Sequence, residues 1–352
     1  MLVSDFHYYP LDFKRPSGTS RGILTKKEAW IVRIWDDKNP KIKGIGECSI
    51  IRGLSPDDRE NYAEKIHEVC QNINQIESYF NGELIEWPSI YFGFEMALKD
   101  LSNNGERLLF ESDFTKNEAQ IPINGLVWMG DKTYMQKQVQ EKIKTGFNCI
   151  KLKIGAINFD EELSIIKSIR EQFSAKEIEI RVDANGAFQP DDAINKLKSL
   201  AEFDIHSIEQ PIKAGNWEAM AKLCQITPLP IALDEELIGV YRLEDKIELI
   251  RQIQPQYIIL KPSLVGGFKG SQEWIDIAEK NAIPWWATSA LESNIGLNAI
   301  AQWVYTLNNP MPQGLGTGQL FTNNIESPLE VSQGHLIYNQ SKKWDLNELL
   351  EA

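Results

Sequence analysis

The sequence is poor in the residues on which zinc-binding and redox proteins depend. Its 352 residues include four cysteines and four histidines, and neither set forms a C-x-x-C, H-x-H or H-E-x-x-H pattern. This absence argues against a zinc finger, a redox-active cysteine pair and a histidine-based metallohydrolase. Because Cys48, Cys70, Cys149 and Cys224 are widely spaced, we expect them to be reduced thiols, most of them buried.

Targeting and membrane signals are also missing from the sequence. No stretch reaches the roughly 18 consecutive apolar residues of a membrane-spanning helix, and Asp5 and His7 stand where a signal peptide needs an apolar run. The chain carries 50 acidic and 37 basic residues, a formal charge of -13, and contains no basic block. This balance argues against nucleic acid or an anionic membrane as partner, so we expect a cytoplasmic protein that binds a small molecule.

A regular alternation of β-rich runs and amphipathic segments begins near residue 120. The β-rich runs lie at 121–127, 149–155, 179–185, 207–212, 230–236, 257–263, 284–291 and 313–318. Segments such as 159–173 and 243–253, with apolar residues at helical spacing, separate them. Repeated βα units form a parallel sheet, and eight units are the number that closes a barrel. We therefore predict an α/β fold with a (β/α)8-type barrel.

The two ends of the chain do not follow this alternation. Residues 1–118 contain alternating segments and then two helical ones, which predicts an α+β domain of its own. Residues 119–325 contain the barrel units and the candidate site. Residues 326–352 add no further βα unit, so we expect this tail to pack back on the first domain or on the barrel exterior.

Three carboxylates fall at the ends of successive predicted strands. Asp183, Glu209 and Asp234 are 26 and 25 residues apart (209 - 183; 234 - 209), one βα unit each. Reactive groups of βα barrels lie at the carboxyl ends of the strands, so these side chains are expected to converge. Such a group of anions needs a counter-charge, and Mg²⁺ fits best, with Mn²⁺ as a substitute. The alternative is a structural network in which the acids pair with lysines or with Arg181.

Lysines flank the three carboxylates on both sides. Lys151 and Lys153 are two residues apart in one predicted strand, so both point into the barrel mouth, and Lys261 ends a strand beyond the carboxylates. Neighbouring ammonium groups repel each other. We therefore expect a lowered pKa for Lys151 or Lys153, which would make that lysine a usable general base. The alternative is that they are surface lysines at a strand edge.

A metal with lysines on either side predicts a reaction class. Coordination of a substrate carboxylate neutralises its charge, so a base such as Lys153 can remove the adjacent proton and leave a metal-stabilised enediolate. Lys261 would be a second acid/base group or an electrostatic clamp. Asn185 and Glu235 would orient the metal ligands.

Two glycine-containing segments are weaker signals. G-L-G-T-G at 314–318 is not the dinucleotide-binding G-x-G-x-x-G pattern, and we expect its backbone N–H groups to line the barrel mouth and hold an anionic group. Gly266 and Gly267 precede a predicted helix, where a tight turn or an anion site is typical.

Five motifs in a fixed order connect the sequence to a known superfamily. They are K-L-K at 151–153, D-A-N at 183–185, E-Q-P at 209–211, L-D-E at 233–235 and L-K-P-S-L-V-G-G at 260–267. On these motifs the chain resembles the enolase superfamily, and specifically its muconate-lactonizing subgroup. The resemblance covers nearly the whole chain and implies that residues 1–118 form a capping domain.

Within that subgroup, three further segments resemble the o-succinylbenzoate synthase family. They are S-G-T-S-R-G at 17–22, S-L-V-G-G at 263–267 and S-A-L-E-S-N-I-G-L-N-A-I-A-Q-W at 289–303. The resemblance implies a syn dehydration of 2-succinyl-6-hydroxy-2,4-cyclohexadiene-1-carboxylate in menaquinone biosynthesis. It also implies that Asp183, Glu209 and Asp234 hold Mg²⁺, that Lys153 is first base and then acid, and that Lys261 stabilises the enediolate.

The same resemblance implies a lid over the substrate. The loop around Ser20 and Arg21 is similar to the mobile loop of this family, and a second loop is expected near residues 47–49. Ser289, at a strand end, is placed to hydrogen-bond the succinyl group. The expected substrate contacts are Ser20, Arg21, Ser289, Gly314, Gly316 and Thr317.

N-acylamino acid racemases and dipeptide epimerases of the same subgroup are competing functions, since lysines on both sides of a metal also serve a two-base proton transfer. Dipeptide epimerases typically carry an Asp-x-Asp motif where this chain has S-A-L-E-S at 289–293, which favours the synthase. A non-catalytic ligand-binding barrel is a third alternative, and the complete set of lysines and carboxylates argues against it. The oligomeric state stays open, with a homo-oligomer among the alternatives.

Overall fold

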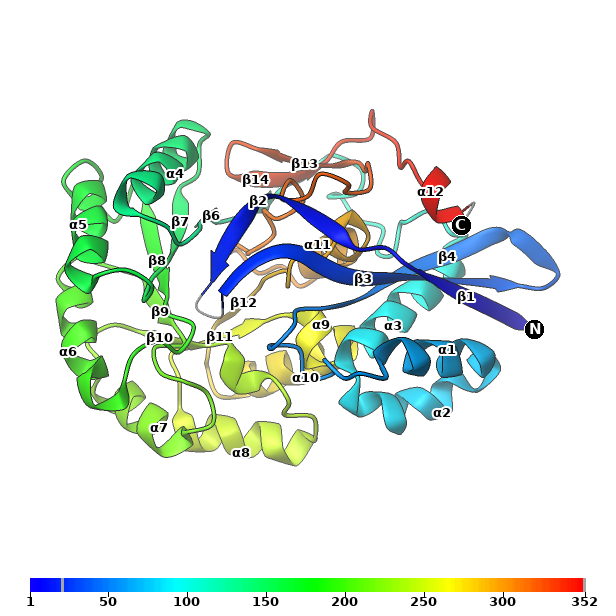
Figure 1. Ribbon diagram of the computed structural model, residues 1–352, viewed down its shortest axis with the longest axis horizontal. Coiled ribbons are helices and arrows are strands. Elements are labelled where there is room, and N and C mark those ends of the chain that lie inside the picture. Colours follow the sequence, from blue (N-terminus) through cyan, green and yellow to red (C-terminus); the bar gives the residue numbers. More distant parts are fainter. Residues whose placement is uncertain (20–21, 351–352) are drawn as a thin grey trace.

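An antiparallel sheet with its own helices lies beside a curled parallel sheet in the computed structural model, which describes residues 1–19 and 22–350 (Figure 1). The antiparallel strands are β1 (Leu2–Tyr8), β2 (Leu11–Thr19), β3 (Gly22–Asp36) and β4 (Asn39–Ile50). β1 and β2 pair with successive parts of one edge of β3, and β4 pairs with the other edge. In Figure 1 the β2–β3 hairpin extends from this sheet toward the parallel strands.

Helix α3 packs directly on β4 because glycines stand where the two elements meet. A Cβ atom on Gly46 would lie 1.9 Å from the Gly93 carbonyl oxygen, and one on Gly93 would lie 2.2 Å from the Cys48 sulfur. The G-I-G sequence of β4 therefore permits an approach that any larger residue would block. The helical elements of this part are α1 (Tyr62–Gln71), η1 (Ile73–Gln75), α2 (Ile76–Phe80), η2 (Glu83–Glu86) and α3 (Pro88–Ser102).

The parallel sheet runs in chain order from β6 to β12, and each strand pairs with the next. Its strands are β6 (Gly125–Val127), β7 (Cys149–Lys153), β8 (Glu179–Asp183), β9 (Ser207–Glu209), β10 (Ile231–Leu233), β11 (Tyr257–Leu260) and β12 (Trp285–Ala287). Their Ile, Val and Leu side chains are buried in one large core, as expected for a sheet covered by helices. The predicted α/β barrel fold is confirmed in this region.

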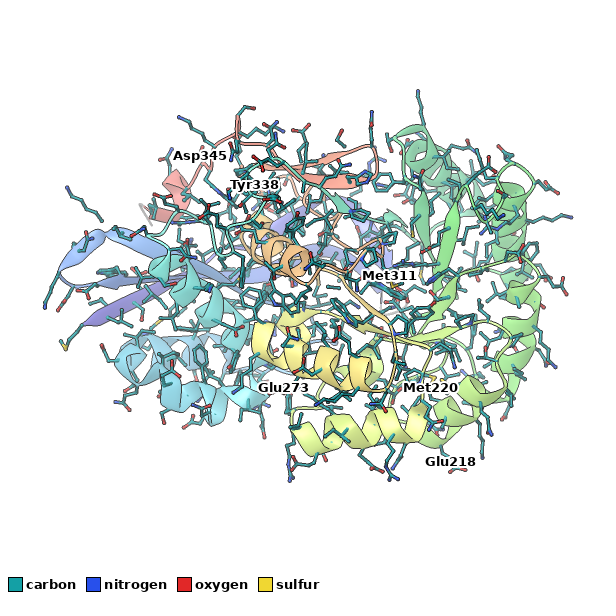
Figure 2. The ribbon with its side chains drawn as sticks, turned by 180° about the vertical axis from the view of Figure 1, so that it is seen from behind. Glu218, Met220, Glu273, Met311, Tyr338 and Asp345 are labelled. Carbon is teal, nitrogen blue, oxygen red and sulfur yellow. The ribbon has the colours of Figure 1, made fainter. Side chains whose placement is uncertain are left out.

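Helices cover the outside of the parallel sheet, and short polar residues begin several of them. Asp131, Asn158, Asn216 and Ser293 each accept a backbone N–H bond at the start of a helix. The helices are α4 (Lys132–Lys144), α5 (Phe159–Arg170), α6 (Pro190–Ala201), α7 (Trp217–Ile226), η3 (Glu235–Leu237), α8 (Leu243–Ile253), α9 (Pro262–Val265), α10 (Gly267–Lys280) and α11 (Asn294–Thr306). Figure 2 labels Glu273 on α10 beside α8, where its carboxylate accepts a 2.7 Å bond from Lys246.

The last predicted strand, 313–318, differs from the expectation. Only isolated parallel bridges form there in the described part of the chain, from Gln313 to Ile123 and from Gly314 to Thr288. The Gly314 N–H donates to the Ala287 carbonyl at 2.8 Å, so two residues link the first and last strands and complete the ring. Met311, labelled in Figure 2, precedes this link and packs on the core cluster around Trp286.

The C-terminal segment contacts both parts of the molecule. β13 (Leu329–Ser332) and β14 (His335–Tyr338) pair with each other, and β14 pairs with β5 (Ile121–Pro122), the strand that leads into the barrel. Beyond them, the Leu349 carbonyl in α12 (Asn347–Leu350) accepts a 2.7 Å bond from Arg33 of β3. The chain end therefore ties the antiparallel sheet to the barrel.

All four cysteines are free and buried, which confirms the expectation of reduced thiols. Among the described residues, no helix has both the length and the apolar composition needed to cross a membrane.

The anion site that the sequence left open at Gly266 and Gly267 is filled by the protein itself. Both glycines have positive φ, +97° and +70°, and form a tight turn before α10. The carboxylate of Glu95, on α3, accepts bonds from the backbone N–H groups of Phe268 at 2.6 Å and Lys269 at 3.3 Å. Burial raises the pKa of Glu95 to about 7, against the opposing effect of these two bonds.

We expect this contact to make the stability of the protein depend on pH. Because the folded state favours protonated Glu95, the free energy of unfolding should fall as the pH rises from about 4.5 to about 7, by up to about 3 kcal/mol. Glu95→Gln keeps an acceptor for Phe268 and removes the titration. The free energy of unfolding, measured with urea at pH 5 and at pH 8, should then decrease less for the variant than for the wild type. An equal decrease in both proteins would contradict the prediction.

Candidate active site

The predicted site residues stand at the carboxyl ends of neighbouring barrel strands. Lys153 ends β7, Asp183 ends β8 and Glu209 ends β9, and the strand register places Lys153 beside Asp183 and Asp183 beside Glu209. Asp234 follows β10 and Lys261 follows β11. The alternation of the two faces along β7 puts Lys151 on the same side as Lys153, so the sequence correctly predicted which residues meet.

The lysines and carboxylates alternate in one continuous row. Lys151 Nζ contacts both Glu209 Oε2 and, at 2.9 Å, Asp183 Oδ2, and Lys153 Nζ lies 3.0 Å from the same Asp183 oxygen. At the other end, Lys261 Nζ contacts Asp234 Oδ2 and lies 3.8 Å from Glu209 Oε1. The structure thus pairs the acids with lysines, as in the alternative network, whereas Arg181 pairs with Glu179.

The row of charges shifts the pKa values of its members. Burial alone would lower the pKa of Lys151, but the charges of Asp183 and Glu209 outweigh burial and raise it. The lowered pKa expected from repulsion between lysines is therefore wrong for Lys151, because the carboxylates lie closer than the sequence reveals. Despite burial, the surrounding lysines hold the pKa of Asp183 well below its usual range, and Lys261 lowers the pKa of Asp234. Burial and the charge of Asp183 raise the pKa of Glu209 to about 8.

Asn185 and Glu235 form the next layer of contacts. Asn185 Oδ1 accepts a 2.7 Å bond from Lys153, and its Nδ2 donates to Glu235 Oε1 at 3.0 Å. The Asn185 N–H also donates to Asp183 Oδ1 at 3.0 Å. Asn185 therefore holds Lys153 and Asp183 in one arrangement.

A cavity of about 300 Å³ opens above this row. Lys151, Lys153, Asp183, Asn185 and Lys261 line its polar part. Among the expected substrate contacts, it brings together Ser289, Gly314, Gly316 and Thr317. The Ser289 and Thr317 hydroxyl groups lie 2.6 Å apart, whereas Ser20 and Arg21 lie outside the described residues.

One expectation about the cavity wall is wrong, and a second does not hold at Gly314. The Gly314 N–H donates to the Ala287 carbonyl in the barrel link, so it is not available to hold an anion. Residues 47–49 belong to β4 and are buried rather than forming a loop. Strand β4 continues to Ile50 because it stays paired with β3 up to that residue. The residues of this segment that line the cavity, Ile51, Arg52 and Leu54, follow the strand.

Sequence reasoning missed much of the apolar lining. Leu126 in β6 and Trp128 just after it reach the cavity beside the polar Asn124, and Ile23 and Leu24 reach it from β3. Strand β6 carries no ionisable residue, so it gave no chemical signal. Its position as the neighbour of β7 was the available clue, since neighbouring strand ends share one cavity.

The donor atoms of the row fit a hard divalent cation. As they stand, no three Asp, Glu, His or Cys side chains among residues 1–19 and 22–350 surround a single metal position, because lysines lie between the acids. Glu209 Oε1 is nevertheless buried without a hydrogen-bond partner. A buried carboxylate oxygen of this kind needs a partner, and three such carboxylates on adjacent strand ends are the ligand set that Mg²⁺ prefers.

The fold and site together define a βα-barrel enzyme with lysines and carboxylates at the ends of its strands. A model of the family described as Enolase C-terminal domain-like matches residues 134–341. The o-succinylbenzoate synthase of Desulfotalea psychrophila is 46% identical over 93% of this chain and 96% of its own length. The crystal structure of MenC from the same organism has a TM-score of 0.85 at 42% identity, covering 96% of this chain and 99% of that chain.

A more distant relative has a different activity. The D-Ala-D/L-Ala epimerase of Cytophaga hutchinsonii is 28% identical over 86% of this chain and 83% of its own length. The chain belongs to the enolase superfamily and, within it, to the family of the Desulfotalea o-succinylbenzoate synthase. The resemblance read from the motifs is thereby confirmed, and enzymes of this superfamily generally use a divalent metal.

Proposed function

We propose that this chain is an o-succinylbenzoate synthase, which dehydrates 2-succinyl-6-hydroxy-2,4-cyclohexadiene-1-carboxylate to 2-succinylbenzoate in menaquinone biosynthesis. The observation that carries the proposal is the alternating row of lysines and carboxylates at the strand ends, in a chain 46% identical to a synthase of that name. The cations at the base of a largely apolar cavity suit a ring that bears carboxylate groups.

Lys153 is the proposed acid–base group. Its Nζ lies at the cavity, 3.0 Å from Asp183 and 2.7 Å from Asn185, so its position is fixed before substrate binds. In its neutral form it removes the proton from the ring carbon that bears the carboxylate, and the C–H electron pair enters an enediolate. The protonated lysine then gives this proton to the departing hydroxyl group on the same face. Water leaves, and a third ring double bond completes the aromatic product.

The other charged residues have electrostatic roles in this proposal. Lys261, across the row, stabilises the enediolate, and Lys151 adds positive charge beside Lys153. Asp183, Glu209 and Asp234 would hold Mg²⁺, or Mn²⁺ in its place. When bound, the cation would neutralise the substrate carboxylate and so favour loss of the adjacent proton. Asn185 and Glu235 keep these ligands oriented.

The three parts of the chain have different roles in this proposal. We propose residues 1–118 as a capping domain, 119–325 as the catalytic barrel and 326–352 as a tail that joins the two. The loop with Ser20 and Arg21 would exclude water from the enediolate. Ser289, Gly314, Gly316 and Thr317, which line the cavity, would contact the substrate. A cytoplasmic location is part of this proposal, and the oligomeric state stays open.

Racemisation or epimerisation of N-acylamino acids or dipeptides is the second candidate function. Lys153 and Lys261 both line the cavity, from strands on either side of the carboxylates, which is the arrangement that a two-base proton transfer needs. The 28% identity to an epimerase supports the same chemistry.

One pair of assays separates the two functions. The purified protein with Mg²⁺ is expected to remove the diene absorbance of the cyclohexadiene substrate rapidly. In parallel, N-succinyl amino acids are incubated in deuterated water. If the diene persists while deuterium enters the α-carbon, the synthase proposal is wrong and the protein is a racemase or epimerase.

A further inference from the structure

A buried lysine outside the row of lysines and carboxylates joins the antiparallel sheet to the wall of the cavity. Lys27, in β3, is 3% exposed. Within the described part of the chain its ammonium group forms no ion pair, and its hydrogen bond goes to the backbone carbonyl of Ala290. Burial lowers the pKa of Lys27, against the opposing charges of Glu292, Glu47 and Asp57. Lysine is rarely buried without a carboxylate partner, since desolvation of the charge is costly. Such a residue needs a reason beyond stability.

The carbonyl that Lys27 holds belongs to the wall of the substrate cavity. Thr288, Ser289, Ala290 and Leu291 all line the cavity, directly after β12. Leu291 has φ of +64°, a left-handed conformation that costs a branched residue about 1–2 kcal/mol. Backbone strain of this kind persists only where the surroundings impose it. Lys27 bonds to Ala290, the residue immediately before Leu291.

Two buried glutamates hold the rest of the same segment. Glu292 is fully buried and accepts a 2.6 Å bond from Ser263, two residues after Lys261. Glu47, in β4, accepts bonds from the N–H groups of Ser293 at 3.0 Å and Gly296 at 3.1 Å. The segment is therefore fixed on one side to the antiparallel sheet and on the other to the start of α9. Lys27 is the member of this group that acts on the lining residues themselves.

We propose that Lys27 is a positioning residue, which fixes the Thr288–Leu291 wall of the cavity from the capping sheet and so sets the affinity for substrate. This inference rests on the proposed function, because the wall is the part assigned to the succinyl end of the substrate. Loss of the ammonium group leaves the Ala290 carbonyl without its donor and lets Leu291 relax. The wall then moves, while Lys153 and Lys261 keep their places on other strands.

The test is a steady-state comparison of Lys27→Met with the wild type on the cyclohexadiene substrate and Mg²⁺. Methionine keeps an unbranched apolar stem and removes the charge. We expect KM, and the Kd for 2-succinylbenzoate measured by calorimetry, to rise at least tenfold, while kcat stays within threefold. A loss of folded protein alone would lower kcat and leave KM unchanged, so the split between them identifies positioning.

Two further variants complete the test. Lys26→Met removes the neighbouring, exposed lysine and should leave both constants unchanged. Lys27→Arg keeps a cation of different shape and should raise KM about threefold at normal kcat. If Lys27→Met does not fold, this variant alone tests whether Lys27 positions the wall. A wild-type KM in whichever of the two Lys27 variants is folded overturns the inference. Failure of the wild type to convert the diene overturns the proposed function instead.

Discussion

Replacing Lys153 with alanine should abolish turnover of the cyclohexadiene substrate, lowering kcat by about 10³-fold. The variant loses the group that takes the ring proton and returns it to the leaving hydroxyl, so both halves of the dehydration fail. Mg²⁺ binding should persist, because Lys153 is a cation beside Asp183 and its removal leaves all three carboxylates in place. Loss of the diene absorbance measures the first effect, and calorimetric titration with Mg²⁺ measures the second.

Lys153→Arg distinguishes proton transfer from a purely electrostatic role. Arginine keeps a positive charge near Asp183 and does not release its proton at neutral pH, so this variant should be as inactive as the alanine variant. Lys198→Ala, an exposed position on the outer helix α6, controls for the loss of a lysine as such. Near-normal activity of Lys153→Ala would refute the mechanism, and an active Lys153→Arg would restrict Lys153 to stabilising charge.

The row of lysines and carboxylates could be predicted from the sequence because two simple periods place its members. One βα unit separates Asp183, Glu209 and Asp234, and parallel strands in register bring such positions to one edge of the sheet. The two-residue period of a strand then puts Lys151 on the same side as Lys153. These rules depend on local spacing alone, so they hold before any tertiary contact is known.

The contacts within the row could not be predicted in the same way. The pKa of Lys151 depends on side-chain distances to Asp183 and Glu209, which spacing along the chain does not give. The same limit applies to Lys27, because its partner at Ala290 is 263 residues away in the chain. The strand predicted over 313–318 differs from the structure for a related reason. Gln313 and Gly314 bridge to both neighbours, yet this short link is not a full strand.

Removal of divalent metal should abolish the dehydration, and Mg²⁺ or Mn²⁺ should restore it. In the structure the lysines contact Asp183, Glu209 and Asp234, and Glu209 Oε1 is buried without a hydrogen-bond partner. A cation held by the three carboxylates would give that oxygen a partner, so the ion pairs and the metal would compete for the same carboxylates.

This competition makes Glu209→Gln the most informative ligand variant. It keeps the size of the side chain and removes one negative charge, so Mg²⁺ affinity should fall at least tenfold while the fold is retained. Activity assayed after exhaustive chelation, and again after titration with Mg²⁺, checks both expectations. Glu202→Gln, at an exposed position just after α6, is the matched control. Full activity in the presence of chelator would show that the three carboxylates serve only as partners of the lysines.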